Sequence, residues 1–276
     1  MKNLLFKTLI CSLICFSQLV TAQDTPEEQP QDNAAELAKK AQNPIANMIS
    51  VPLQNNTNFG IGEYERSQNV LNIQPVIPAS LGKWNLINRF IAPITWQPDV
   101  LQADGTTVGL GDIVYQGFFT PAKSSGSVTW GVGPVLIFPT ATDIRLGSEK
   151  WSAGPAGIVV AFVNKWVLGG VIYNAWSYAG NNDRADVNSG VFQYFVNYNL
   201  PKAWYLTSAP ILSVNWKARK DDQWIIPFGA GAGKIFGIGK QKFNGQVGAY
   251  YNAVKPATMD GPDWSLRFQL VFLFPK

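Results

Sequence analysis

The sequence predicts an all-β fold: a transmembrane, antiparallel, up-and-down β-barrel of about 12 strands with a short N-terminal helix. Pairs of tryptophans that are 10 or 12 residues apart bracket segments of alternating polarity. In an extended strand, residues of the same parity share a face, so both members of a pair point the same way. At roughly 3.3 Å per residue and a tilt of about 40°, the spacing covers roughly 25 to 30 Å, which is the height of a lipid-facing band.

The segment from Trp84 to Trp96 illustrates the two faces. Its even positions read Trp, Leu, Asn, Phe, Ala, Ile and Trp, whereas its odd positions include Asn85, Arg89 and Thr95. We expect the even face to meet lipid and the odd face to line a polar lumen. A soluble β-sandwich also alternates, but three segments with matched tryptophans favour the membrane barrel. The predicted aromatic girdle consists of Trp84, Trp96, Trp166, Trp176, Trp204, Trp216 and Trp264.

Residues 1–22 are predicted to be a secretory signal peptide. Two lysines precede an apolar run from Leu9 to Val20, which ends in a cleavage pattern of small residues at Ala22. The run is too short for a transmembrane helix, and no later stretch is continuously apolar over the ~20 residues that such a helix needs. Cys11 and Cys15 both lie in this segment, so we expect no disulfide in the mature chain. Each follows an isoleucine where a lipoprotein signal requires a small residue.

Residues 23–50 are predicted to be an acidic, disordered spacer followed by a short helix. The spacing of Asn33 and Glu36 is that of a capping box, which opens a helix through about residue 42. Asn43 and Pro44 interrupt the helix, and Pro44 can start a second turn that runs to Ile49. The segment either rests at the barrel rim or enters the lumen as a plug. The apolar stripe that would make the plug consists of Leu37, Ala41, Ile45, Met48 and Ile49.

Residues 51–276 are predicted to form the barrel. The alternating segments number about 12, an even number as single-chain bacterial barrels require. Their approximate spans are 51–60, 67–78, 84–96, 108–120, 128–139, 151–163, 166–178, 188–199, 204–216, 224–235, 242–252 and 264–274. The connections between them alternate between short turns and longer, charged loops. Because short turns belong in the periplasm and long loops outside, we expect both termini in the periplasm of a bacterial outer membrane.

The residue composition argues against an enzyme. The chain has no histidine, which removes the usual general base and the commonest metal ligand, so we expect no catalytic residue, no metal and no cofactor. The glycine-rich stretch from Gly229 to Lys234 is not a phosphate loop, because Phe228 and Ile235 occupy positions that need Gly and Ser or Thr. Period-two glycine more often lets a sheet bend or a neighbour approach. The mature chain would carry 20 basic and 18 acidic residues, a net charge of +2, and nothing in it calls for nucleic acid.

Charged residues of lumen parity remain as candidates for the functional site. They are Arg89, Asp112, Lys217, Lys234 and Arg267. One interpretation is a network of ion pairs and hydrogen bonds that satisfies a narrow barrel interior. The other is a ring that sets the selectivity of a channel.

The final segment, 264–274, alternates Trp, Leu and Phe with Ser265, Arg267 and Gln269. It resembles the C-terminal recognition signal of outer-membrane proteins, which implies the barrel assembly machinery as a partner. It departs from the usual signal by ending Phe274-Pro275-Lys276.

Several stretches resemble the outer-membrane family associated with the meta-pathway of phenol degradation, a MetA-like transporter family whose members are sometimes labelled neuromedin U. They are QNPIAN at 42–47, SVPLQNNTNFG at 50–60, NVLNIQP at 69–75, GLGD at 109–112 and the closing LRF to FPK. The resemblance covers nearly all of the predicted mature chain. It implies a barrel and suggests uptake of small, often aromatic compounds.

The expected function is a channel or transporter for small apolar or aromatic solutes, which diffuse passively through a narrow lumen. A barrel of about 12 strands falls between filled eight-stranded barrels and open porins of 16 to 18 strands. The alternative is a structural barrel that transports nothing, or that presents its loops to partners. The expected partners are outer-membrane lipid, the assembly machinery and the solute.

Overall fold

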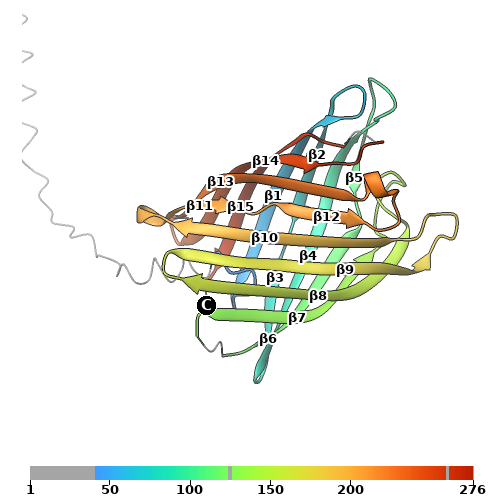
Figure 1. The fold of residues 1–276 in the computed structure, drawn as a ribbon. Helices are drawn as coiled ribbons and strands as arrows, with labels where there is room; N and C mark the ends of the chain where they lie inside the picture. Colours follow the sequence, from blue (N-terminus) through green and yellow to red (C-terminus); the bar gives the residue numbers. More distant parts are fainter. Residues whose placement is uncertain (1–40, 124–125, 259–260, 276) are drawn as a thin grey trace, which may run out of the picture. The chain divides into compact units, whose positions relative to one another are not determined.

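The computed structural model describes residues 41–123, 126–258 and 261–275, which all belong to one compact unit (Figure 1). It contains 15 strands and two short 3-10 helices. The strands are β1 (Ile49–Ile61), β2 (Arg66–Ile73), β3 (Val76–Leu81), β4 (Trp84–Pro98), β5 (Thr106–Leu110), β6 (Ile113–Pro121), β7 (Val128–Phe138), β8 (Lys150–Val163), β9 (Trp166–Gly180), β10 (Asn188–Asn199), β11 (Trp204–Ser208), β12 (Ile211–Asn215), β13 (Trp224–Ile238), β14 (Gln241–Val254) and β15 (Trp264–Phe274). The 3-10 helices are η1 (Pro201–Ala203) and η2 (Lys220–Asp222).

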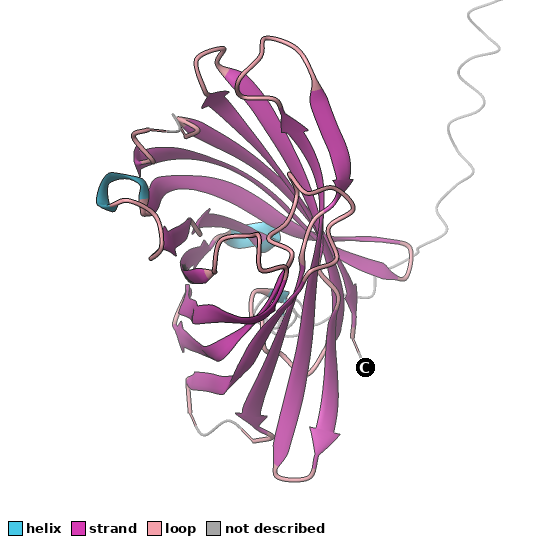
Figure 2. Ribbon diagram, turned by 90° about the vertical axis from the view of Figure 1, so that its right-hand side faces the viewer, coloured by secondary structure: helices cyan, strands magenta, loops and turns pink. Residues whose placement is uncertain are grey.

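These strands form one closed antiparallel barrel (Figures 1 and 2). The last strand, β15, pairs with the first, β1, from Ile49 opposite Phe274 to Phe59 opposite Trp264, and this ladder closes the ring. The pairs β2–β3, β5–β6 and β11–β12 each occupy one position in the wall, so the 15 strands make 12 wall positions. The predicted fold class and strand count are confirmed.

Three wall positions are each divided between two strands, and proline or glycine marks the break in each of them. Pro75 follows β2, and Pro210 precedes β12. Proline has no N–H to give to a ladder, so strands end or bulge around it. Between β5 and β6 the interruption is Gly111-Asp112. Where β12 and β13 no longer pair, the Ser208 hydroxyl donates to the Gly229 carbonyl at 2.7 Å and bridges the strands.

The two ends of the barrel differ in their connections (Figure 1). At one end, two-residue turns join β3 to β4, β8 to β9 and β13 to β14. The first residues of these turns are Gly82, Asn164 and Gly239, with φ of 72°, 52° and 57°, as tight hairpins require. We call this the short-turn end. The opposite end carries longer connections, such as those that follow β4 and β7, and we call it the loop end.

Side chains alternate between an outer face and the interior. All seven tryptophans of the predicted girdle are exposed, with between 37% and 51% of their surface accessible. The interior of β4 and of β6 to β10 is mainly apolar, and its buried side chains include Ile87, Phe118, Val135, Val160 and Phe195. The interior of β1, β2, β14 and β15 is rich in amides. The lumen therefore has an apolar side and a polar side.

The chain before β1 departs from the prediction. The signal peptide, the spacer and most of the predicted helix fall outside the described residues. The second helical turn predicted from Pro44 to Ile49 is wrong, because 44–48 form turns and bends. The Asn43 side chain accepts from the Ile45 amide at 3.1 Å, an Asx-type bond that competes with helix. None of the helices in the described part of the chain is long and apolar enough to cross a membrane.

Candidate functional site

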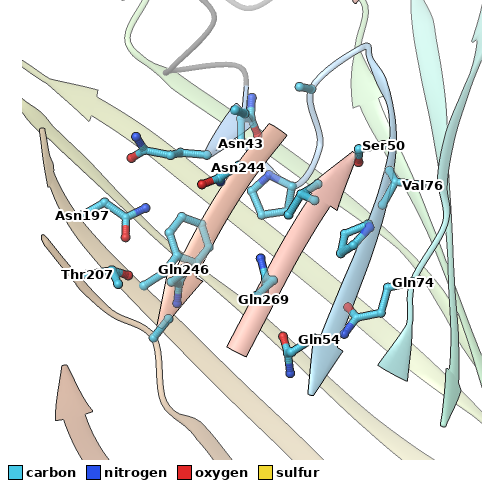
Figure 3. A pocket seen from close by; sticks show the side chains of 18 of the residues that line it. Asn43, Ser50, Gln54, Gln74, Val76, Asn197, Thr207, Asn244, Gln246 and Gln269 are labelled. Carbon is cyan, nitrogen blue, oxygen red and sulfur yellow. The ribbon is translucent and has the colours of Figure 1, made fainter. Parts of the chain in front are cut away.

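A cavity of about 150 Å³ lies inside the barrel toward the short-turn end. Its polar side chains converge from several strands, as Figure 3 shows for Gln54, Gln74, Asn197, Asn244 and Gln269. Most of the polar residues that line the cavity are neutral amides: Gln42, Asn43, Gln54, Gln74, Gln193, Asn197, Asn244, Gln246 and Gln269. The remaining lining includes two arginines and apolar side chains. The cavity can therefore offer hydrogen bonds on one side and apolar contact on the other.

Arg89, the first of these arginines, points into the lumen from β4. Its Nη1 donates to Oε1 of Gln116 on β6 at 3.2 Å, and its Nη2 donates to Oε1 of Gln74 at 2.6 Å. Gln74 lies in the interruption between β2 and β3. Both partners are neutral.

Arg267, the second arginine, lies on β15 and reaches across the lumen. Its Nε donates to Oδ1 of Asn56 on β1 at 2.9 Å. Its Nη1 donates to the carbonyl of Ala209 at 2.7 Å, at the interruption between β11 and β12. Its guanidinium also lies over the ring of Tyr250, 4.7 Å from the centroid. The side chain therefore ties three parts of the wall together.

Arg267 also lines a second cavity, of about 220 Å³, toward the loop end. Asn58, Asn252 and Ser265 line this second cavity as well. Of the residues around the two cavities, only Arg267 belongs to both. The guanidinium thus lies between two compartments of the lumen.

Residues 41–48 form the short-turn side of the lining of the first cavity. Ile45 is 3% exposed and joins the apolar cluster of the barrel interior. Met48 and Ala46 pack against Val271 and Leu273 of β15. The side-chain Nε2 of Gln42 donates to Oδ1 of Asn199 at 2.7 Å. The described part of this segment lies within the barrel instead of resting outside it. We call residues 41–48 the lumen segment.

The other three predicted plug residues lie in different places. Ala41 packs against Tyr205 and Ile235 of the wall. Leu37 lies outside the described residues. Ile49 does not belong to the lumen segment, because it is the first residue of β1 and is 37% exposed on the outer face. It pairs with Phe274, and the strand turns its side chain outward.

Lys234 is not a lumen residue, which corrects the prediction. It pairs with Trp204 of β11, and its Nζ lies over the Trp204 ring at 5.1 Å from the centroid. Phe228, on the same face of β13, is 57% exposed. A lysine near a strand end can face outward because its apolar stem covers aromatic surface while its charged tip reaches the polar interface.

Lys217 and Asp112 also lie away from the arginines. Lys217 is exposed in the turn after β12, where its amide donates to the Asn215 side chain. Asp112 holds the connection between β7 and β8. Its Oδ2 accepts from the amide and hydroxyl of Ser148 at 2.7 and 2.8 Å, and its Oδ1 accepts from the Ala141 amide at 3.3 Å. Asp112 is a loop anchor, so the predicted ring of five charges reduces to Arg89 and Arg267.

In the part of the chain that the structure describes, acidic side chains are confined to the connections between strands. Among the described residues they are Glu63, Glu65, Asp99, Asp104, Asp112, Asp143, Glu149, Asp183, Asp186, Asp221, Asp222 and Asp263, and none of them lines either cavity. Several are paired locally. Hydrogen bonds from Arg145 lower the pKa of Asp143 to about 2, and Lys150 lies 3.3 Å from Asp186.

Sequence reasoning missed the amides that hold the arginines. Asn56, which accepts from Arg267, shares the parity of the lumen face of β1, so the alternation pattern could have identified it. Nothing in the sequence pairs Gln74 with Arg89 or places the Ala209 carbonyl near Arg267, because these contacts depend on the closure of the barrel. The described residues contain no cluster of three or more His, Cys, Asp or Glu side chains that could hold a metal ion.

No family model matches the chain, and no curated protein matches it either. Among solved structures, the COG4313 outer membrane channel from Pseudomonas putida F1 superposes with a TM-score of 0.60 and 19% identity, over 82% of this chain and 94% of that one. Outer membrane phospholipase A from Escherichia coli gives 0.44 and 12%, over 88% and 97% of the two chains. The Pseudomonas putida toluene transporter TodX gives 0.37 and 9%, over 86% and 92%. The first of these likenesses shows that the chain has the fold of an outer-membrane β-barrel.

Proposed function

We propose that this protein is an outer-membrane channel through which small apolar or aromatic solutes diffuse passively. The observation that carries the proposal is the pair of cavities, which lie inside a closed barrel on either side of Arg267. The interior of an eight-stranded barrel is just wide enough for side chains to fill it, and a barrel of 12 wall positions is wider. Here polar and apolar groups surround cavities, as in sites that bind small molecules.

The likeness to the COG4313 channel supports the proposal at the level of the fold. The resemblance to the phenol meta-pathway family adds aromatic solutes as the compounds to test. We place both termini in the periplasm, because short turns face that side in bacterial barrels. Under this proposal residues 1–22 are a signal peptide, the barrel assembly machinery inserts the chain, and Arg89 and Arg267 set the selectivity. We propose no catalytic role, since the chain lacks histidine.

A structural barrel is the second candidate, and one observation favours it. The Arg267 side chain and the lumen segment both extend into the interior, and their hydrogen bonds join strands that are not neighbours in the wall. A barrel whose lumen is blocked in this way would stiffen the membrane without conducting ions. The two candidates differ in whether the interior admits ions.

Purified mature protein in planar lipid bilayers tests the choice between them. The channel proposal predicts discrete, small conductance steps, with fewer ions passing than through an open porin, because the lumen segment and Arg267 narrow the path. Heat-modifiable migration on gels would verify that the inserted protein is folded. Folded protein that never conducts would exclude the channel and favour the structural candidate.

A further inference from the structure

We propose that the cavity between the lumen segment and Arg267 binds a small organic anion, with an apolar body and one carboxylate, through Arg89 and Arg267. The inference rests on the proposed channel and names the class of its solute. It begins from a charge imbalance in the barrel. The two arginines face the same cavity, and none of the carboxylates in the described part of the chain lines that cavity.

The partners of both arginines are neutral. Arg89 donates to two glutamine oxygens, and Arg267 donates to an asparagine oxygen and a backbone carbonyl. Neither arginine takes part in a salt bridge with a described residue. A buried charge without a counter-charge is unfavourable, and an anion that enters the cavity would supply the missing one. By contrast, the buried Lys150 at the loop end has its own carboxylate in Asp186.

The guanidinium groups retain donors for such an anion. Each guanidinium has five N–H donors, and the hydrogen bonds described above use two of them in each case. A planar guanidinium can bind a carboxylate through two parallel hydrogen bonds. The surrounding amides can donate further bonds to the same oxygens. This chemistry favours a carboxylate over a neutral polar group.

The rest of the cavity suits an apolar body of limited size. Val76, Val171, Phe195, Val271 and Leu273 belong to its lining. A cavity of about 150 Å³ corresponds to the volume of about five water molecules at about 30 Å³ each, which suits a carboxylic acid with no more than a single ring. The apolar body would displace water from these side chains, while the carboxylate meets the arginines.

Charges at the two ends of the barrel are consistent with an anionic solute. Five connections lie at the short-turn end, because those between β6 and β7 and between β10 and β11 join the three two-residue turns. Each carries one lysine and no acidic residue, and these lysines are Lys83, Lys123, Lys165, Lys202 and Lys240. The acidic residues of the described chain all lie at the loop end, in the connections outside the strands. An anion that passes the loop end therefore meets increasingly positive surroundings toward the short-turn end, which focuses the field on the cavity.

Isothermal titration calorimetry of the mature protein in lipid nanodiscs tests the proposal, with benzoate as the probe and benzamide as its neutral isostere. We expect benzoate to bind at least tenfold more tightly than benzamide. The Arg89→Met variant and the Arg89→Met/Arg267→Met double variant should each lose this preference. Lys234→Met removes a strand cation from the outer face, so it should bind benzoate like the wild-type protein. Arg267→Lys keeps the charge and should retain part of the preference.

Equal binding of benzoate and benzamide, or unchanged binding by folded Arg89→Met protein, would overturn the proposal. The Arg89→Met variant keeps the Arg267 contact with Ala209. It therefore still tests the proposal if the double variant does not fold. Failure of the channel proposal gives a different pattern. Benzoate binding without conductance would support the anion site and exclude the channel. Conductance without benzoate binding would support the channel and exclude the anion site.

Discussion

Individual glycines make room for aromatic side chains in the barrel interior. A Cβ atom at Gly233 would lie 2.2 Å from the ring of Tyr205 on the paired strand β11. Tyr205 is buried and lines the first cavity, and its hydroxyl donates to Oδ1 of Asn244 at 2.7 Å. The glycine-rich stretch that superficially resembles a phosphate loop thus shapes the cavity wall.

The Gly233→Ala substitution should therefore destabilise the barrel by about 1–3 kcal/mol, the usual cost of overpacking a core. The matched control is Gly157→Ala in β8, because the nearest atom to a Cβ there is Cγ2 of Ile172 at an ordinary 3.8 Å. Urea unfolding in lipid, monitored by tryptophan fluorescence, measures the stability of both variants. Equal midpoints for the two variants would show that the Tyr205 packing does not limit stability.

Single residues also show where alternation fails as a guide. Lys234 is predicted to face the lumen as a charged residue of lumen parity, yet it lies over Trp204 on the outer face. Arg89, which alternation also assigned to the lumen, does line the cavity. Distance from the membrane edge does not separate the two residues, since Arg89 lies five residues from the short-turn end of β4 and Lys234 lies four residues from that of β13. They differ in the face they occupy, because Lys234 shares the outer face of β13 with the exposed Phe228.

Individual strands follow the sequence pattern closely. The predicted span 264–274 matches β15, and the span 188–199 matches β10. The divided wall positions were not predicted, although Pro75 and Pro210 mark two of them. A proline in an alternating segment indicates that the ladder is disturbed, but only the neighbouring strands determine which hydrogen bonds are lost and which side chains replace them.

The β4 strand provides a test of membrane depth. Phe90 and Trp96 are both 37% exposed on the outer face, and they differ in their distance from the end of the strand. An arginine costs about 2–4 kcal/mol at the bilayer midplane and about 0–1 kcal/mol near an interface. Phe90→Arg should therefore reduce folding into lipid vesicles much more than Trp96→Arg does. Equal folding yields, measured by heat-modifiable migration, would show that β4 does not cross the bilayer in this register.

At the scale of the whole molecule, closure of the barrel creates the features that the sequence could not reveal. Arg267 meets the Ala209 carbonyl and Asn56 because strands that are distant in sequence become neighbours around one lumen. The apolar stripe of the N-terminal segment indicated a possible plug. Its actual contacts, such as Met48 against Leu273, arise only when β15 pairs with β1.

The central claim is that the barrel contains a conducting path narrowed by the lumen segment. Single-channel conductance of a variant that lacks residues 23–48 tests it most directly, with deletion of residues 23–40 as the control that keeps the segment. The longer deletion should raise the conductance while heat-modifiable migration is preserved, because the β1–β15 ladder begins at Ile49 and closes the ring without these residues. The shorter deletion should leave the conductance low. Identical conductance in the two deletion variants, or none in either, would contradict the account.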